Sequence, residues 1–240
     1  MSGQSFGRAQ LALNLRLRDA SSFENYFVAR NREAVERLQQ AVQGLSGVPQ
    51  APASWIFLWG EPGTGKTHLL EAACRAAQAQ GHAPLYVPLA SSADFTAALL
   101  EDAEQAPLVC MDDVDAIAGD ATWEAALFAL YERLRAQGGM LVLAARHSPA
   151  AIGLKLADLA TRLAAGLVYQ LKPLSDPEKI AALRLRAQRR GLEMTEEVAN
   201  YLLARFPRDT HSLFALLDKL DTATLVAQRR LTIPFLRGLE

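Results

Sequence analysis

The amino-acid sequence predicts an α/β fold, with a core built on a five-stranded parallel sheet and a small all-helical domain after it. Up to residue 173, short apolar runs alternate with segments whose apolar residues recur at helical spacing, which is typical of parallel strands joined by helices. From residue 174 on, only the helical spacing remains. Strands are expected at 55–59, 85–89, 107–111, 140–145 and 167–171.

Helices are expected before the first strand and between the later ones. The first covers 31–43, and the segment 44–54 after it, rich in Gly, Pro and Ser, is predicted to be a loop. A helix over 67–80 follows the first strand and stops at Gly81, because glycine is common just beyond helix ends. Three further helices are expected in the core, at 93–104, 121–136 and 155–165.

The all-helical part begins at Ser175. Residues 175–178 (SDPE) combine a capping box with a proline in the first turn, which predicts the start of a helix. The sequence therefore divides into an N-terminal segment (1–22), an α/β domain (23–173) and a helical lid (174–240). The helices of the lid are expected at 176–190, 196–205, 210–220 and 222–230.

The composition is that of an ordinary globular protein of 240 residues, of which 50% are hydrophobic and 21% charged. The net charge of −1 argues against a broad electrostatic surface for nucleic acid. Both cysteines, Cys74 and Cys110, fall in apolar segments, as buried thiols of a reducing compartment do. No run has the features of a signal peptide or a membrane span, so we expect a cytoplasmic protein without a membrane partner.

Residues 60–67 (GEPGTGKT) fit G-x-x-x-x-G-K-[ST], the phosphate-binding loop of nucleoside triphosphatases. Its glycines let backbone N–H groups surround phosphate oxygens, Lys66 reaches the β- and γ-phosphates, and the Thr67 hydroxyl can ligate Mg²⁺. A glycine-rich turn could match this pattern by accident, but a strand precedes this one and a helix N-terminus follows it, where phosphate is favoured. The candidate nucleotide-binding residues are Gly60, Pro62, Gly63, Thr64, Gly65, Lys66, Thr67 and His68.

Two carboxylates, Asp112 and Asp113, follow the strand at 107–111. Ligands gather at the carboxyl ends of parallel strands. We therefore expect Asp112 to hold Mg²⁺ together with Thr67, and Asp113 to polarise an attacking water. Both aspartates would also suit a strand-to-helix turn, and the phosphate loop earlier in the chain favours the metal.

Arg162 is a further candidate, because a guanidinium near a γ-phosphate can stabilise transition-state charge as an arginine finger. The alternative is a surface arginine that pairs with Asp158 one turn earlier. Spacing alone does not choose between the two.

The phosphate loop, the aspartate pair, residues 158–163 (DLATRL) and the helical end of the chain together resemble the AAA+ ATPases of the replication-initiator (DnaA) group. The resemblance is closer still to the regulatory inactivators of DnaA, the Hda family. It covers nearly the whole chain, and its most specific parts lie near the two ends. Besides 158–163, the segments that carry it are 10–15, 174–176, 212–221 and 228–235.

In that family, an N-terminal Gln-Leu-x-Leu-x-Leu segment docks on the DNA polymerase sliding clamp (beta subunit). The matching residues here are Gln10, Leu11, Leu13 and Leu15, with Asn14 where relatives often have proline. An extended peptide can insert alternate leucines into an apolar pocket. The residues alone favour packing of these leucines on the chain's own core, whereas the resemblance implies clamp docking.

The resemblance also implies a role for Arg162: the family uses this position in trans, on the ATP of DnaA, to promote hydrolysis and so switch off initiation. The family lacks the DNA-binding domain of DnaA, so contact with DNA is expected only through the clamp complex. Self-association could bury Arg162, which makes a homodimer a further candidate state.

Two departures from the family pattern suggest weak hydrolysis of the chain's own nucleotide. The strand at 140–145 ends with Ala144 and Ala145 and is followed by Arg146 and His147. At this strand end, AAA+ relatives usually offer a small polar residue that positions water. His211 stands where relatives carry an arginine that reaches the phosphates, and imidazole does not reproduce a bidentate cation. Arg208 is the candidate replacement for the lid arginine, and the bound nucleotide is expected to be ADP or ATP.

Three functions are therefore weighed. The first is a factor that activates ATP hydrolysis by DnaA and so acts as a negative regulator of replication initiation. The second is an autonomous AAA+ ATPase, such as a helicase loader. The third is an interaction module whose fold is stabilised by nucleotide.

Overall fold

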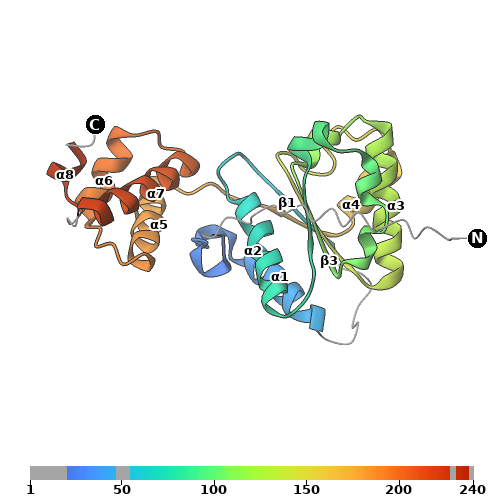
Figure 1. Ribbon diagram of the computed structural model, residues 1–240. Coiled ribbons are helices and arrows are strands. Elements are labelled where there is room, and N and C mark those ends of the chain that lie inside the picture. The colour runs from blue at the N-terminus through green and yellow to red at the C-terminus, as the bar shows by residue number, and fades with distance from the viewer. Residues whose placement is uncertain (1–20, 47–54, 228–230, 238–240) are drawn as a thin grey trace, which may run out of the picture.

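The computed structural model describes residues 21–46, 55–227 and 231–237. Within these ranges, five parallel strands form one sheet in the order β2-β3-β4-β1-β5 (Figure 1). The predicted five-stranded parallel sheet is thereby confirmed. The strands are β1 (Trp55–Trp59), β2 (Leu85–Pro88), β3 (Leu108–Asp112), β4 (Met140–Ala145) and β5 (Leu167–Gln170).

One pair of helices covers each face of the sheet. The pairs are α1 (Arg32–Gln43) with α2 (Lys66–Ala79), and α3 (Ala121–Gln137) with α4 (Ala157–Ala164). Successive residues of a strand point to opposite faces, so each strand contributes apolar side chains to both. In β1, Ile56 packs with the first pair, α1 and α2, and Phe57 packs with the second pair, α3 and α4. Figure 1 shows the first pair on the side of the sheet nearer the lid and the second pair on the far side.

The helix predicted at 93–104 is wrong. Short 3-10 helices take its place, at Leu89–Asp94, Ala97–Leu100 and Ala103–Gln105. Ala97, Leu100 and Ala103 are buried, but Glu101 and Asp102 between them have extended and left-handed backbone angles, which interrupt a continuous α-helix. The other 3-10 helices of the core are Phe23–Asn25, Ala29–Asn31, Gly44–Ser46 and Val114–Ile117.

The lid packs around an apolar cluster of its own, which includes Leu183, Leu202 and Leu217. The predicted capping box is present at its start, where the Ser175 backbone N–H and hydroxyl both donate to a Glu178 carboxylate oxygen at 2.7 Å. The helices of the lid are α5 (Asp176–Arg189), α6 (Glu196–Arg205), α7 (Thr210–Ala227) and α8 (Ile233–Arg237).

The lid differs from the prediction in two places. One continuous helix, α7, replaces the pair expected at 210–220 and 222–230, because no glycine or proline interrupts the stretch it covers. The short α8 was not expected; Pro234 lies in its first turn, where proline is tolerated. None of the helices in the described ranges has the length and hydropathy that a bilayer crossing requires.

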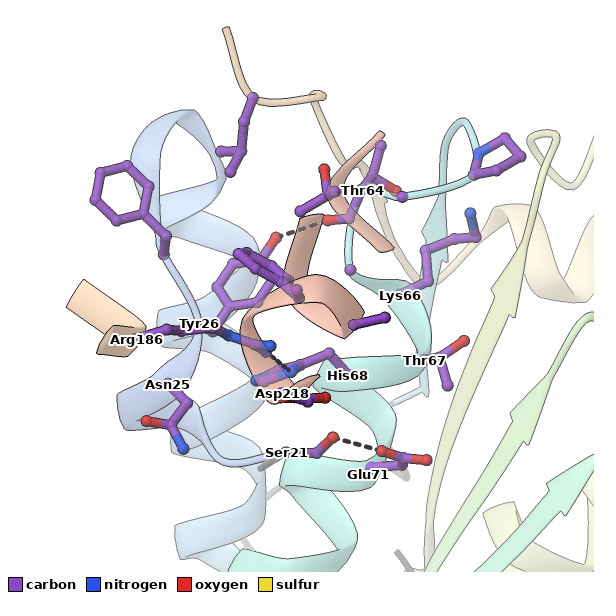
Figure 2. A pocket seen from close by; sticks show the side chains of 18 of the residues that line it. Ser21, Asn25, Tyr26, Thr64, Lys66, Thr67, His68, Glu71, Arg186 and Asp218 are labelled. Carbon is purple, nitrogen blue, oxygen red and sulfur yellow. Dashed lines mark hydrogen bonds between the residues drawn. The ribbon is translucent and has the colours of Figure 1, made fainter. Parts of the chain in front are cut away.

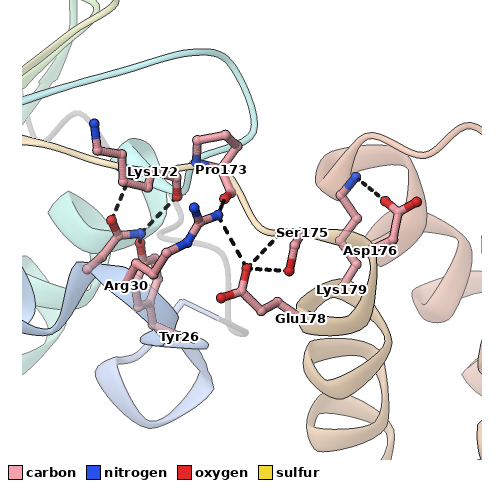
Figure 3. A network of polar contacts seen from close by, with 9 residues as sticks. Tyr26, Arg30, Lys172, Pro173, Ser175, Asp176, Glu178 and Lys179 are labelled. Atoms are coloured by element: carbon pink, nitrogen blue, oxygen red, sulfur yellow. Dashed lines mark hydrogen bonds and ion pairs between the residues drawn. The ribbon is translucent and has the colours of Figure 1, made fainter.

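The connection between core and lid is held from the α1 side (Figure 3). The Asn31 side chain makes two hydrogen bonds with the Lys172 backbone. The Lys172 N–H donates to Asn31 Oδ1 at 2.7 Å, and Asn31 Nδ2 donates to the Lys172 carbonyl at 3.1 Å. Arg30 donates to the Pro173 carbonyl at 2.5 Å and pairs with Glu178 at 3.4 Å. The chain just before α1 therefore sets the path by which the lid leaves the sheet.

Candidate functional site

A cleft of about 780 Å³ lies where the core meets the lid, within the size range of small-molecule sites. Most of its lining comes from three parts of the chain: the segment 21–27, the phosphate loop with the first turns of α2, and helices α5 and α7 of the lid with Leu174 before them. Asp113 and Arg146, which follow β3 and β4, complete it. Figure 2 shows side chains from all three parts around it, among them Tyr26, Lys66 and Arg186.

The phosphate loop has backbone angles that glycine adopts readily: φ is +80° at Gly63 and +91° at Gly65. A Cβ on Gly65 would meet the Tyr26 ring at 2.5 Å, so the loop is pressed against that ring. The Tyr26 hydroxyl donates to the Thr64 carbonyl at 3.1 Å, which fixes the other side of the same turn. The loop is thus shaped by its own glycines and by a tyrosine from the segment before α1.

The residues predicted from the loop pattern fall together at this cleft. Gly60 lies just below it; its N–H donates to the Ala145 carbonyl at 3.2 Å, and a Cβ there would meet the Leu171 carbonyl at 2.6 Å. Lys66 Nζ donates to the Gly60 carbonyl at 2.6 Å and the Glu61 carbonyl at 3.0 Å. The cleft itself is lined by Pro62, Gly63, Thr64, Gly65, Lys66, Thr67 and His68.

The two predicted carboxylates have different surroundings. Asp113 lines the cleft in a left-handed backbone conformation, with φ at +54°. Burial raises the pKa of Asp113, and the neighbouring Asp112 carboxylate adds to that effect. Asp112 lies beneath the lining, 2% exposed, and accepts hydrogen bonds from the Tyr86 hydroxyl and the Asp113 N–H, each at 3.0 Å.

Lys66 provides the cation at the centre of the site. Burial lowers the pKa of Lys66, whereas the Asp112 and Asp113 carboxylates act in the opposite direction. Arg146, at the end of β4, also lines the cleft and supplies a second cation near Asp113. A triphosphate or diphosphate would therefore meet positive charge from Lys66, from Arg146 after β4 and from the N-terminus of α2.

Arg208, the candidate replacement for the lid arginine that reaches the phosphates, does not line the cleft. Its guanidinium pairs with Asp176 at 3.3 Å while its side chain remains 63% exposed. Asp176 is the first residue of α5, and Arg208 lies in the connection between α6 and α7. The side chain of His211 lies outside the described part of the structure, as do Gln10, Leu11, Leu13 and Leu15.

Several cleft residues were missed by the sequence analysis, because they belong to no phosphate-binding pattern. Arg186 of α5 stacks its guanidinium on the Phe214 ring, 3.8 Å from the ring centroid. Arg190 pairs with Asp218, and both line the cleft. One signal could have pointed to this wall: Arg186 lies between Leu183 and Ala187, two of the buried positions of α5. The remaining residues that were missed are Ser21, Asn25, Tyr26, Phe27, Glu71, Leu174, Thr210 and Ala215.

His68 joins the three parts of the cleft. Its Nε2 lies 2.8 Å from the Ser22 carbonyl, and its Nδ1 lies 3.2 Å from an Arg186 nitrogen (Figure 2). Because a carbonyl only accepts and a guanidinium only donates, the imidazole must be neutral with its proton on Nε2. Burial lowers the pKa of His68 to about 4, and Arg186 adds to the effect while the bond to Ser22 opposes it.

We expect His68 to make the protein less stable in mild acid. The folded-state pKa of about 4 lies below that of an unfolded histidine, about 6.5, so between these values the unfolded chain binds the proton more tightly. The contribution is complete above pH 6.5 and is lost as pH falls towards 4, on the order of 2 kcal/mol between pH 7 and pH 5. Urea unfolding of wild type and His68→Gln at both pH values measures this. Parallel pH profiles for the two proteins would contradict the assignment.

Arg162 lies away from the cleft. It is on α4, whose Leu159 and Leu163 pack on the sheet face opposite α2. Its guanidinium is 3.7 Å from Glu132 of α3 and its side chain is 46% exposed, so the pairing with Asp158 that the spacing allowed is replaced by one to α3. No residue of α4 lines the cleft.

The residues present fit a bound nucleotide with Mg²⁺. Gly60, Gly63 and Gly65 all have positive φ, the backbone conformation in which glycine lets the N–H groups of such a loop turn towards phosphate oxygens. Thr67 offers a hydroxyl and Asp112 a carboxylate for the metal. In the described ranges no three acidic, His or Cys residues form a cluster able to hold a metal ion alone. Mg²⁺ commonly binds through one or two carboxylates plus substrate phosphates, which such a site allows.

Comparison with known proteins agrees with this arrangement. Residues 17–170 match the family model of the bacterial DnaA ATPase domain, and residues 176–239 match that of the Hda lid domain. Similar solved structures include the replication initiator DnaA bound to AMPPCP and single-stranded DNA, with a TM-score of 0.71 and 23% identity over 85% of this chain and 65% of that one.

Two further DnaA structures are also similar. AMPPCP-bound DnaA from Aquifex aeolicus has a TM-score of 0.67 and 24% identity, over 82% of this chain and 65% of that one. Domain III of Thermotoga maritima DnaA has a TM-score of 0.73 and 19% identity, over 90% and 94%. At these identities the likeness shows the fold, and the chain spans about two thirds of the length of the first two DnaA chains. The matched family model, which covers more than half of the sequence, shows that this chain belongs to the bacterial DnaA ATPase-domain family of AAA+ proteins and carries a lid of the Hda type.

Proposed function

We propose that this protein is a negative regulator of DNA replication initiation that stimulates ATP hydrolysis by DnaA. It docks on the DNA-loaded sliding clamp through residues 10–15 and presents Arg162 to the ATP of DnaA. One observation carries the proposal: Arg162 is exposed on α4, on the face of the sheet opposite the helix that begins at the chain's own phosphate loop. From there its guanidinium lies away from the chain's own cleft and is accessible to a partner molecule.

The cleft is proposed to hold ADP or ATP with Mg²⁺. The loop from Gly60 to Thr67 would hold the phosphates, with Lys66 and Arg146 as cations, and Asp112 with Thr67 would hold the metal. Mg²⁺, when bound, would neutralise phosphate charge. The support is the glycine geometry of the loop and the charge of its surroundings.

Weak hydrolysis of the chain's own nucleotide is part of this proposal. Asp113 is the candidate group to polarise water, and Arg146 stands near it after β4 in place of a small polar residue. Arg208 is engaged by Asp176 on the outer side of the lid. Bound nucleotide then serves mainly to hold core and lid together, since the cleft is lined by both.

An autonomous ATPase, such as a helicase loader, is the second candidate. The observation that favours it is that Lys66, Thr67 and Asp113 all line one cleft, together with Arg146. Under this function the isolated protein would turn over ATP, and single-stranded DNA would stimulate it. A third candidate, an interaction module stabilised by nucleotide, would show neither activity.

The deciding experiment measures hydrolysis of radiolabelled ATP preloaded on DnaA. We expect addition of this protein with clamp and DNA to accelerate that hydrolysis, and Leu13→Ala with Leu15→Ala to remove the acceleration by preventing docking on the clamp. A parallel assay without DnaA gives the intrinsic turnover. Rapid turnover there, with no effect on DnaA-bound ATP, would support the helicase-loader function in its place.

A further inference from the structure

Tyr86 makes a hydrogen bond to the buried carboxylate of Asp112, beneath the cleft. It lies on β2, where its register partner on β3 is Cys110. Its ring lies on the α1–α2 face of the sheet and extends forward along the neighbouring strand, so that its hydroxyl donates to Asp112 Oδ2 at 3.0 Å. Tyr86 is absent from the cleft lining, and its hydrogen bond to this carboxylate connects it with the site.

The contact completes the hydrogen bonding of a buried carboxylate. Asp112 is 2% exposed, and its other oxygen, Oδ1, accepts the Asp113 N–H at 3.0 Å. A carboxylate held at both oxygens by fixed donors cannot rotate about its last bond without losing one of them. Each oxygen still has a lone pair available, so the group remains able to face a metal or a metal-bound water.

Lys66 is the competitor for the same carboxylate. Asp112 is the charge with the largest effect on the Lys66 ammonium, which lies at the start of α2. Without a second donor, electrostatic attraction would turn Asp112 towards this ammonium. The carboxylate would then be neutralised by the lysine that the phosphates require.

We propose that Tyr86 is a positioning residue for the metal site, whose hydroxyl holds the Asp112 carboxylate in the orientation that binds Mg²⁺ and keeps it apart from Lys66. This inference rests on the proposed nucleotide site and adds a residue outside the phosphate-loop and aspartate patterns. Groups that orient metal-ligating carboxylates typically affect metal affinity about 10- to 100-fold.

The test is Tyr86→Phe, which keeps the ring and removes the hydroxyl. Binding of fluorescent ADP is measured first in EDTA and then during a Mg²⁺ titration. We expect the affinity in EDTA to stay within about twofold of wild type, since Tyr86 does not line the cleft. The Mg²⁺ concentration that gives half of the metal-dependent gain should rise about tenfold. Thermal unfolding of both proteins without nucleotide checks that the variant is folded.

Tyr169→Phe is the matched control, because it removes a hydroxyl from β5 on the same face of the sheet, away from Asp112. It should leave the Mg²⁺ titration as in wild type. In an Asp112→Asn background, the further change Tyr86→Phe should have no effect on the Mg²⁺ response, because the charged group that it orients is gone.

Three outcomes would overturn the inference: an unchanged Mg²⁺ midpoint in Tyr86→Phe, an equal loss of affinity with and without the metal, or an undiminished effect in the Asp112→Asn background. The second outcome would mean that the hydroxyl shapes the cleft in general. Failure of wild type to bind ADP in EDTA would instead contradict the proposed nucleotide site, so the two failures are distinguishable.

Discussion

Replacing Arg162 with alanine is expected to abolish the stimulation of DnaA-bound ATP hydrolysis, reducing the stimulated rate by about 10³-fold or more. The side chain is 46% exposed on α4, and its partner among the described residues is Glu132 at 3.7 Å, so a phosphate group on another molecule can recruit the guanidinium. A surface pair of this kind contributes at most about 1 kcal/mol, so the variant should fold with nearly unchanged stability. Single-turnover hydrolysis with clamp and DNA measures the effect.

Arg32→Ala is a suitable control for this experiment. Arg32 is an exposed arginine on α1 that pairs with Glu36 at the same distance, 3.7 Å, and its loss should leave the stimulation intact. Arg162→Lys separates charge from geometry: a lysine keeps the cation but lacks the planar fork, so we expect it to restore little activity. Clamp binding by the alanine variant should equal that of wild type. Full stimulation by Arg162→Ala would refute the role of this residue.

Gly65→Ala is expected to weaken nucleotide binding at least 100-fold. A residue with a Cβ is strained at the φ of +91° found here, and the added methyl would meet the Tyr26 ring at 2.5 Å. Moving that ring would break the hydrogen bond from its hydroxyl to the Thr64 carbonyl and disturb the turn that surrounds the phosphates. Titration with fluorescent ADP measures the loss.

Gly81→Ala provides the matched control. Gly81 has a similar φ of +83° at the end of α2, but nothing lies within 4 Å of the position of its Cβ. It should therefore cost about 1–2 kcal/mol of stability through backbone strain and leave nucleotide affinity unchanged. If both variants lost affinity equally, strain and not the contact with Tyr26 would be the cause.

The order of strands and helices could be predicted from the sequence, because hydrophobic periodicity and the phosphate loop are local signals. The buried residues at 97, 100 and 103 show the limit: a spacing of three fits a helix on paper, and only packing against α3 selects the 3-10 form. Helix α7 shows a second limit. Two helices were predicted, at 210–220 and 222–230, although no glycine or proline separates them and one helix forms.

The candidate site could be predicted only in part, for a related reason. The loop residues are contiguous, so their pattern was visible. Tyr26 and Arg186 come from segments far from the loop in sequence and reach the cleft only through tertiary structure. The pairing of Arg208 with Asp176 likewise depends on how α5 and α7 begin, which spacing along the chain does not reveal.

Arg162 lies on the face of the sheet covered by α3 and α4, whereas the cleft lies at the carboxyl ends of the strands beside the lid. This separation also limits how copies of this chain can assemble. Two copies related by a two-fold axis cannot each supply the other's cleft with an arginine, because that exchange requires both features on one surface. Contacts of this type are heterologous and would close into a ring or continue as a filament. A dimer with two-fold symmetry must therefore use a different surface. In an open head-to-tail filament, the molecule at one end would have a cleft without a neighbouring arginine, and the molecule at the other end an Arg162 without a neighbouring cleft.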